Sequence, residues 1–227
     1  MRIVLDTCVL YPPSLRDLLL TLARLEAFEL RWSQEILEEF ERNVLSEHPD
    51  ISPKRFRSHT IAAMTTNFPD AFLRGPDTEP VAIVGVHQKD QPVAGLAIAT
   101  GSDTIVTQNL RHFPARALAK HGLRAISPGT LVTELDQDEP AQIDQAVQSL
   151  ARRWKNPPRT VDEILTSSSC IPAWRRRFEP CENDTGRTDR QKVGAGRHPR
   201  LYDLASKQAM PVRSRSPAPH ISPGQQG

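Results

Sequence analysis

The stretch IVLDTCVLYPPSLRDLLLTLA, residues 3–23, joins an apolar run to a leucine-rich segment and predicts the class of the fold. It opens with a short apolar run that ends at Asp6, which predicts a buried parallel strand over residues 2–5. Residues 12–14, Pro-Pro-Ser, then predict a helix start, because proline fits the first helical turn. The leucines that follow recur at helical spacing and predict one apolar face: Leu15, Leu18, Leu19, Leu22 and Leu25. A strand that leads into an amphipathic helix is the repeating unit of an α/β fold.

Strands and helices continue to alternate as far as about residue 154. The expected strands cover residues 30–32, 103–107 and 123–126, with 81–84 as a further candidate. The expected helices cover residues 34–47, 53–67, 92–100, 114–121, 128–135 and 140–154. Ser33 is the expected N-cap of the helix that follows it, and Gly101 is expected to close the helix that starts at Pro92. This order predicts the α/β class with a mostly parallel sheet between helical layers.

Charge divides the chain near residue 169. Up to that point there are 18 Lys and Arg against 22 Asp and Glu, a net charge of −4, and beyond it 11 against 5, a net charge of +6. The second part is also polar and rich in Pro, Gly and Ser. We therefore expect a globular domain over residues 1–165 and a basic, low-complexity, disordered tail over residues 166–227.

The cysteines and the hydropathy indicate a cytoplasmic protein. Three cysteines without regular spacing do not make a disulfide framework, which favours a reducing compartment. Cys8 has no paired histidine nearby in the sequence and is expected to be a small packed side chain, not a nucleophile. Asp6 interrupts the first apolar run before it reaches the length of a signal peptide, and no apolar stretch approaches the length of a membrane span. No membrane partner is expected.

Polar side chains follow the expected strands at the edge where ligands bind in parallel sheets. Asp6 and Thr7 follow the first strand, and Thr107 and Asn109 follow the strand at 104–106. Further acids stand near the starts of two helices: Glu35, Glu38, Glu39 and Asp90. If these elements converge, the carboxylates repel one another unless a cation neutralises them, and hard oxygen ligands select Mg²⁺ or Mn²⁺. Such ions activate water and stabilise charge on a phosphate, which is the chemistry of phosphodiester cleavage.

Each of these residues also has a purely structural interpretation. Asp6 could cap a turn, Asp90 could complement a helix dipole, and Asn109 could occupy a left-handed turn. His87 and His112 lack the spacing of a metal-binding pair and are expected to be surface residues. Periodicity and spacing alone therefore predict an α/β domain with a candidate acidic site.

Four segments resemble the PIN-domain family, within its VapC-like toxin branch. They are residues 3–23, LRWSQEILEEFERNV at 30–44, KDQPVAGLAIATGSDTIVTQNLRHFP at 89–114, and AISPGTL at 125–131 followed by KNPPRTVDEIL at 155–165. The order of LDTCVL, WSxEILEE and DTIVTxNLRxFP makes the likeness specific. It extends over about residues 2 to 165.

The resemblance implies a Rossmann-like three-layer α/β/α sandwich and an Mg²⁺- or Mn²⁺-dependent ribonuclease. Family members are often toxins silenced by an antitoxin protein, and they often form homodimers. Matched position by position, the metal ligands fall on Asp6, Glu39 and Asp90, with Glu38 left open as an alternative to Glu39. The last catalytic polar residue falls on Asn109.

The chain also departs from the family pattern around Asp90. His87 stands where the family has an acid, Gln91-Pro92 replaces an Arg-His pair, and His112 replaces a frequent aspartate. Neutral imidazole is a poor ligand for Mg²⁺. Two hypotheses follow, namely an active metal-dependent endoribonuclease or a catalytically degenerate PIN domain that binds RNA or a protein without cleavage. A haloacid-dehalogenase-type phosphatase does not fit, because Cys8 occupies the position of its second aspartate.

Overall fold

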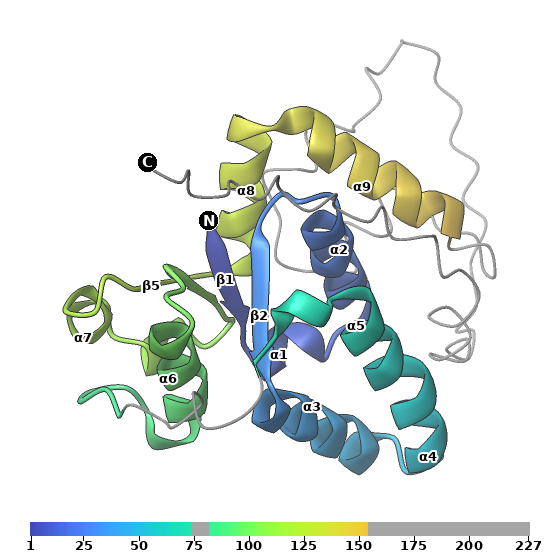
Figure 1. The fold of residues 1–227 in the computed structure, drawn as a ribbon, viewed down its shortest axis with the longest axis horizontal. Helices are drawn as coiled ribbons and strands as arrows, with labels where there is room; N and C mark the ends of the chain where they lie inside the picture. Colours follow the sequence, from blue (N-terminus) through green and yellow to red (C-terminus); the bar gives the residue numbers. More distant parts are fainter. Residues whose placement is uncertain (74–81, 154–227) are drawn as a thin grey trace, which may run out of the picture.

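The computed structural model describes residues 1–73 and 82–153, and its centre is a five-stranded parallel sheet. The strands are β1 (Arg2–Leu5), β2 (Glu29–Ser33), β3 (Phe72–Leu73), β4 (Thr104–Val106) and β5 (Arg124–Ile126). Their order is β3-β2-β1-β4-β5, so the chain builds outward from β1 in one direction and then crosses to its other side. Helices flank the sheet on both faces, which makes the described part an α/β/α sandwich (Figure 1).

The α-helices have the following bounds: α1 Thr7–Leu10, α2 Pro13–Arg24, α3 Gln34–Glu47, α4 Pro53–Phe56, α5 Ala62–Asn67, α6 Gln91–Ala99, α7 Ala115–Ala119, α8 Pro128–Asp138 and α9 Pro140–Arg153. A π-helical turn, Arg57–Ile61, joins α4 to α5. Short 3₁₀ turns cover Pro69–Ala71, Gln88–Asp90 and Leu110–His112. No helix in the described ranges has the length and apolar character needed to cross a bilayer.

Strand β1 is the centre of the core because it is apolar on both faces. Ile3, Val4 and Leu5 are fully buried, and β1 pairs with β2 on one side and β4 on the other. A continuous apolar run suits a strand that is covered by helices on both faces. The order of the strands puts the ends of β1 and β4, at residues 6 and 107, at the point where the chain reverses direction across the sheet.

The helices next to β1 form for the reasons that the sequence indicates. Helix α2 begins with proline in its first turn and buries its leucine face, and it packs against α9. Helix α3 is capped by Ser33, whose Oγ accepts a hydrogen bond from the Ile36 backbone N–H at 3.3 Å. Gly101 follows the C-terminus of α6 and has φ +58°. This is a left-handed backbone conformation that favours glycine.

Most expected elements are confirmed, and three details are wrong. A strand was expected at 81–84, but residues 82–84 form no strand. Val81 lies outside the described residues. The one-turn helix α1 and the two-residue strand β3 were not expected, because neither is long enough to show a periodicity. Trp154 and the expected tail, 166–227, also lie outside the described residues.

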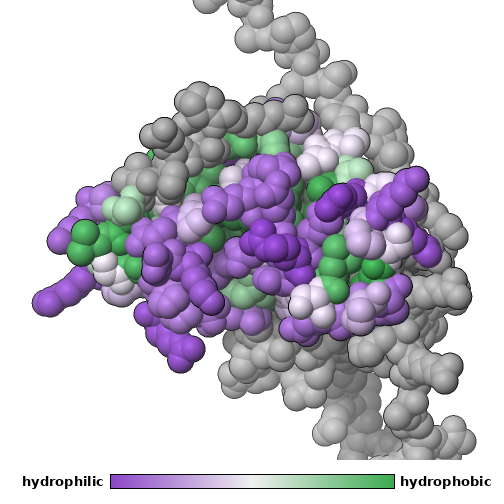
Figure 2. Space-filling view, turned by 90° about the horizontal axis from the view of Figure 1, so that it is seen from below, coloured by the Kyte–Doolittle hydropathy of each residue, from purple (hydrophilic) through white to green (hydrophobic). Residues whose placement is uncertain are grey.

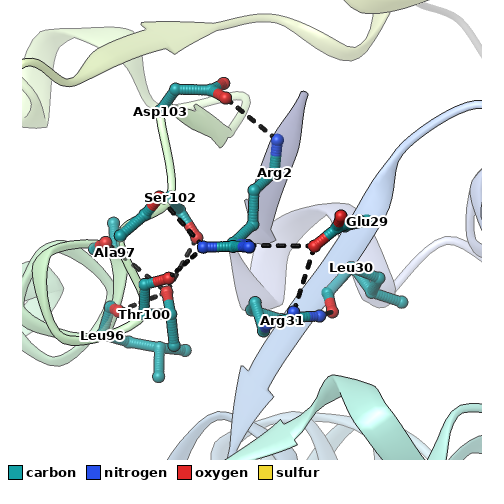
Figure 3. Close-up of polar contacts among 10 residues, drawn as sticks. Arg2, Glu29, Leu30, Arg31, Leu96, Ala97, Thr100, Ser102 and Asp103 are labelled. Carbon is teal, nitrogen blue, oxygen red and sulfur yellow. Dashed lines mark hydrogen bonds and ion pairs between the residues drawn. The ribbon is translucent and has the colours of Figure 1, made fainter. Parts of the chain in front are cut away.

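The amino ends of the strands are joined by an Arg2-centred network (Figure 3). The Arg2 backbone N–H donates to Asp103 Oδ2 at 3.0 Å, and its Nε donates to Glu29 Oε2 at 3.1 Å. Arg31 Nη2 donates to the same Glu29 oxygen at 3.1 Å, and Arg2 Nη1 donates to the Thr100 carbonyl at 2.8 Å. The hydrogen bond and charge of Arg2 lower the pKa of Glu29. At this end of the sheet the chain neutralises its own carboxylates.

Candidate functional site

At the opposite end of the sheet, the first residues after β1 and β4 are hydrogen-bonded to each other. Thr107 Oγ1 donates to Asp6 Oδ2 at 2.6 Å, and both residues are buried. Cys8 Sγ donates to the same oxygen at 3.0 Å, and the Asn109 backbone N–H donates to Thr107 Oγ1 at 2.9 Å. The Asp6 carboxylate is therefore held in one orientation, and Asn109 begins its turn directly beside it.

Glu39 reaches this end of the sheet from α3. Thr7 Oγ1 donates to Glu39 Oε2 at 3.1 Å, which ties the helix to the residue next to Asp6. Burial raises the pKa of Glu39, and the negative charges of Asp6 and Asp90 raise it further. The Thr7 hydrogen bond and the charge of Arg42 oppose this shift without cancelling it. Two carboxylates from distant parts of the sequence, Asp6 and Asp90, thus act electrostatically on Glu39.

The neighbouring Glu38 faces away from this group. Its side chain is exposed and accepts a hydrogen bond from Gln34 Nε2 at 2.8 Å, one helical turn earlier. Of the two glutamates left open by the sequence, Glu39 is the one that faces Asp6 and Asp90. Figure 2 views the molecule from the side toward which β2 points and shows hydrophilic side chains gathered across the middle of that face.

Asp90 lies between two histidines, of which His87 is exposed, as the sequence predicts, and His112 is partly buried. Asp90 Oδ2 is 3.2 Å from His87 Nδ1 and 3.0 Å from His112 Nδ1. The two imidazole rings stack with their centroids 4.6 Å apart. The His87 backbone N–H also donates to the His112 carbonyl at 3.1 Å, which fixes the two turns side by side. The His112 side chain is only 25% exposed.

These three residues are the one group of three or more His, Cys, Asp or Glu in the described ranges whose ligand atoms lie within 4.8 Å of one another. Asp6 and Glu39 belong to the same electrostatic neighbourhood but not to this tighter group. Asp90 Oδ2 and His112 Nδ1 are both buried and have no hydrogen-bond partner among the described residues. An unsatisfied buried polar atom costs about 1–3 kcal/mol, so both atoms fit a role as cation ligands.

Cys8 has the properties expected of a packed side chain. Burial and the charge of Asp6 raise the pKa of its thiol to about 12. The thiol is therefore protonated near neutral pH, and only the thiolate is a nucleophile or metal ligand. Its role in the site is to donate a hydrogen bond to Asp6 and to accept one from the Gln108 backbone N–H at 3.3 Å.

The comparisons with known proteins agree with this arrangement. A family model described as PIN domain matches residues 2–111. A curated protein of Mycobacterium tuberculosis (strain ATCC 25618 / H37Rv), named "Putative ribonuclease VapC50", is 31% identical over 86 residues, which are 37% of this chain and 50% of that protein. The chain thus spans about half the length of this relative. No solved structure matches the chain. Together with the parallel α/β/α fold, these matches show that residues 2–111 are similar to PIN domains and that the chain is similar to a VapC-type protein.

Proposed function

We propose that this protein is a divalent-metal-dependent endoribonuclease that hydrolyses RNA phosphodiester bonds. The observation that carries the proposal is geometric: the hydrogen bond from Thr7 Oγ1 to Glu39 Oε2 at 3.1 Å brings the α3 carboxylate beside Asp6 at the carboxyl end of β1, where the charges of Asp6 and Asp90 help to raise its pKa. A cluster of this kind is stabilised by a bound cation. The match to a protein named as a ribonuclease supports RNA as the substrate.

The metal ligands in this proposal are Asp6, Glu39 and Asp90. A bound Mg²⁺ or Mn²⁺ would supply an activated water and charge stabilisation on the phosphate. Thr107 and Cys8 hold the Asp6 carboxylate in orientation, and Thr7 does the same for Glu39. A ligand held by hydrogen bonds loses less conformational freedom when it binds an ion.

Asn109 is the proposed polar residue that orients the ion or the phosphate. It follows β4 by three residues, and its backbone is fixed by the hydrogen bond to Thr107 Oγ1. An amide side chain suits this position because its NH₂ group donates to anionic oxygens and its carbonyl accepts from water. Substrate selectivity would come from single-stranded or looped RNA, whose phosphates can enter an acidic site with the ion.

The biological role is proposed from the family. A VapC-like protein is expected to be the toxin of a toxin–antitoxin pair, with an antitoxin protein as its partner, a homodimer as its assembly and the cytoplasm as its location. The nuclease domain would cover residues 1–165. Co-purification of the full chain with the product of a neighbouring gene would test the pairing.

Cleavage of a labelled structured RNA by the purified full chain tests the activity. We expect cleavage with Mg²⁺ or Mn²⁺ and none after chelation with EDTA. Glu39→Gln should abolish it, whereas Glu38→Gln is the matched control, since Glu38 lies one residue away and is exposed. A folded protein that cuts equally well with both substitutions would overturn the proposed site.

A second candidate function is a catalytically degenerate PIN domain that binds RNA or a protein without cutting. The histidines beside Asp90 favour it, because they stand where the family has or often has acids. The two functions differ in one measurement. RNA retained in a filter-binding assay, with no cleavage in either Mg²⁺ or Mn²⁺, would support the degenerate form.

A further inference from the structure

We propose that His87, Asp90 and His112 form a binding position for a first-row transition-metal ion, with Zn²⁺ as its representative, and that this position does not select Mg²⁺. It adjoins the proposed nuclease site through Asp90, the residue common to both. Only the participation of this ion in RNA cleavage rests on the proposed function. Binding of the ion is a separate property and is tested separately.

The spacing of the ligand atoms fits one ion. Zn²⁺ lies about 2.0–2.2 Å from imidazole nitrogen and carboxylate oxygen, so two tetrahedral ligands lie roughly 3.3 Å apart. Asp90 Oδ2 is 3.2 Å from His87 Nδ1 and 3.0 Å from His112 Nδ1. All three ligand atoms lie within 4.8 Å of one another. The side chains would need only small adjustments to coordinate an ion between them.

The hydrogen bonding of the three residues is incomplete, which is the second observation. Asp90 Oδ2 and His112 Nδ1 are buried and lack a hydrogen-bond partner in the described part of the chain, although they are only 3.0 Å apart. His87 Nδ1 accepts from the Lys89 backbone N–H at 3.3 Å, so this nitrogen carries a lone pair and faces Asp90 Oδ2. A cation between these atoms would satisfy the carboxylate oxygen and the imidazole nitrogens together.

The backbone already holds the two histidines in place. His87 and His112 belong to separate turns, and the His87 N–H···O=C hydrogen bond to His112 joins them at 3.1 Å. The Asp90 backbone N–H donates to the His87 carbonyl at 2.9 Å, and the His112 backbone N–H donates to the Asn109 carbonyl at 2.9 Å. A site whose ligands are positioned before binding loses less entropy when the ion arrives.

The ligand types decide the class of ion. Imidazole suits Zn²⁺, Ni²⁺, Cu²⁺ and Fe²⁺, whereas Mg²⁺ prefers an octahedral set of oxygen atoms. Two imidazoles and one carboxylate leave at least one coordination position for water or a phosphate oxygen, as in catalytic zinc sites. Replacement of acids by His87 and His112 would therefore change the ion preference of this side of the site and need not abolish metal binding.

Isothermal titration of Zn²⁺ into the metal-free full chain tests the proposal, with Co²⁺ absorption as an independent signature of coordination. His87→Ala and His112→Ala should each weaken Zn²⁺ binding at least roughly tenfold, since loss of even a residue that supports a ligand has this effect. The matched control is His121→Ala, because His121 is exposed and outside the group. A double variant, His198→Ala with His220→Ala, controls for binding by the tail.

Zn²⁺ binding that depends on His87 and His112, and that excess Mg²⁺ does not displace, would support the proposal. No Zn²⁺ binding, or binding that both alanine variants retain, would overturn it. Circular dichroism of each variant shows whether it is folded, and His112→Asn provides a variant close in size if the alanine variant is not. Zn²⁺ binding without RNA cleavage would leave this inference standing and remove the proposed function, whereas Mg²⁺-dependent cleavage without Zn²⁺ binding would do the reverse.

Discussion

The two ends of the parallel sheet carry the same kind of charge but treat it in opposite ways. At the amino ends, Glu29 is paired with Arg2 and Arg31, and the Arg2 hydrogen bond lowers its pKa. At the carboxyl ends, burial together with Asp6 and Asp90 raises the pKa of Glu39. The first end is neutralised by the chain itself and serves structure. At the second, the charges of Asp6 and Asp90 act on Glu39 and the charge of Arg42 opposes them only in part, which is the property expected of a site that a cation completes.

Substitution of one aspartate at each end of the sheet should affect RNA cleavage very differently. Asp6→Asn should reduce RNA cleavage about a thousandfold, because a metal ligand supplies several kcal/mol of charge stabilisation and each 1.4 kcal/mol, approximately, is a factor of ten. Asp103→Asn, at the other end, should leave cleavage unchanged, since the Asp103 carboxylate accepts hydrogen bonds from the Arg2 backbone N–H and from Thr104 Oγ1 at the amino ends of the strands. Single-turnover rates in Mn²⁺ measure both. Equal losses in the two variants would contradict the division of roles.

The thiol beside Asp6 reports the charge of the carboxyl end. With a pKa of about 12, Cys8 should react with iodoacetamide at pH 8 roughly 30- to 60-fold more slowly than an ordinary thiol, because the lower thiolate fraction outweighs its greater nucleophilicity. Asp6→Asn should speed the reaction by removing the second cause of the shift. Peptide mass spectrometry separates Cys8 from Cys170 and Cys181. Rapid alkylation of Cys8 in the wild-type protein would show that the thiol is not held as described.

A carboxylate in place of the imidazole at position 112 should change which ion this end of the sheet prefers. His112→Asp places a second acid beside Asp90, so Mg²⁺ affinity should rise roughly tenfold, in line with the dependence of such ions on ligand charge, while Zn²⁺ affinity falls. Calorimetric titration with each ion gives both numbers. If Mg²⁺ affinity falls together with that of Zn²⁺, His112 has a structural role only.

The smallest expected effect is on stability. Because folding raises the pKa of Glu39, its ionised form opposes folding, and Glu39→Gln should raise the Tm of the metal-free protein by at most roughly 2–4 °C, the shift that about 1 kcal/mol produces in a domain of this size. The folded state binds more protons at this group, so the stability of the wild type relative to the variant falls as pH rises from the ordinary pKa of glutamate through the raised one. Glu29→Gln should not stabilise the protein at any pH.

Thermal melts in EDTA across pH 4 to 8 measure this difference, and saturating Mn²⁺ should reverse its sign, because the ion stabilises the wild type and not the variant. A wild type that is more stable than Glu39→Gln in EDTA at pH 8 would show that Glu39 is already neutralised by the chain.

The sequence predicted the sheet and most helices because their patterns are local. The apolar run of β1, the leucine spacing of α2 and the Ser33 cap of α3 each lie within one segment and carry their own physical cause. The prediction of a strand at 81–84 is wrong for residues 82–84, because residues 84 and 85 form a turn. Residues 82–84 have the apolar composition of a strand, but they pair with no strand among the described residues.

The candidate site was predictable only in part. The acids were predicted from their positions after strands and near the starts of helices. The choice of Glu39 over Glu38 needed the structure, in which Thr7 donates a hydrogen bond to Glu39. The grouping of His87 with His112 was missed, because it depends on a backbone hydrogen bond between turns 25 residues apart in sequence. No periodicity reports such a contact, although the presence of two histidines where the family has acids was a usable signal.

A crystal structure of the full chain grown with Mn²⁺ would show whether the acids at the carboxyl ends of the strands hold a divalent cation. We predict an anomalous peak within coordination distance of Asp90 and of Asp6 or Glu39, which is lost in Asp6→Asn crystals. A peak elsewhere on the surface, or none at Mn²⁺ concentrations that support other nucleases, would contradict the account.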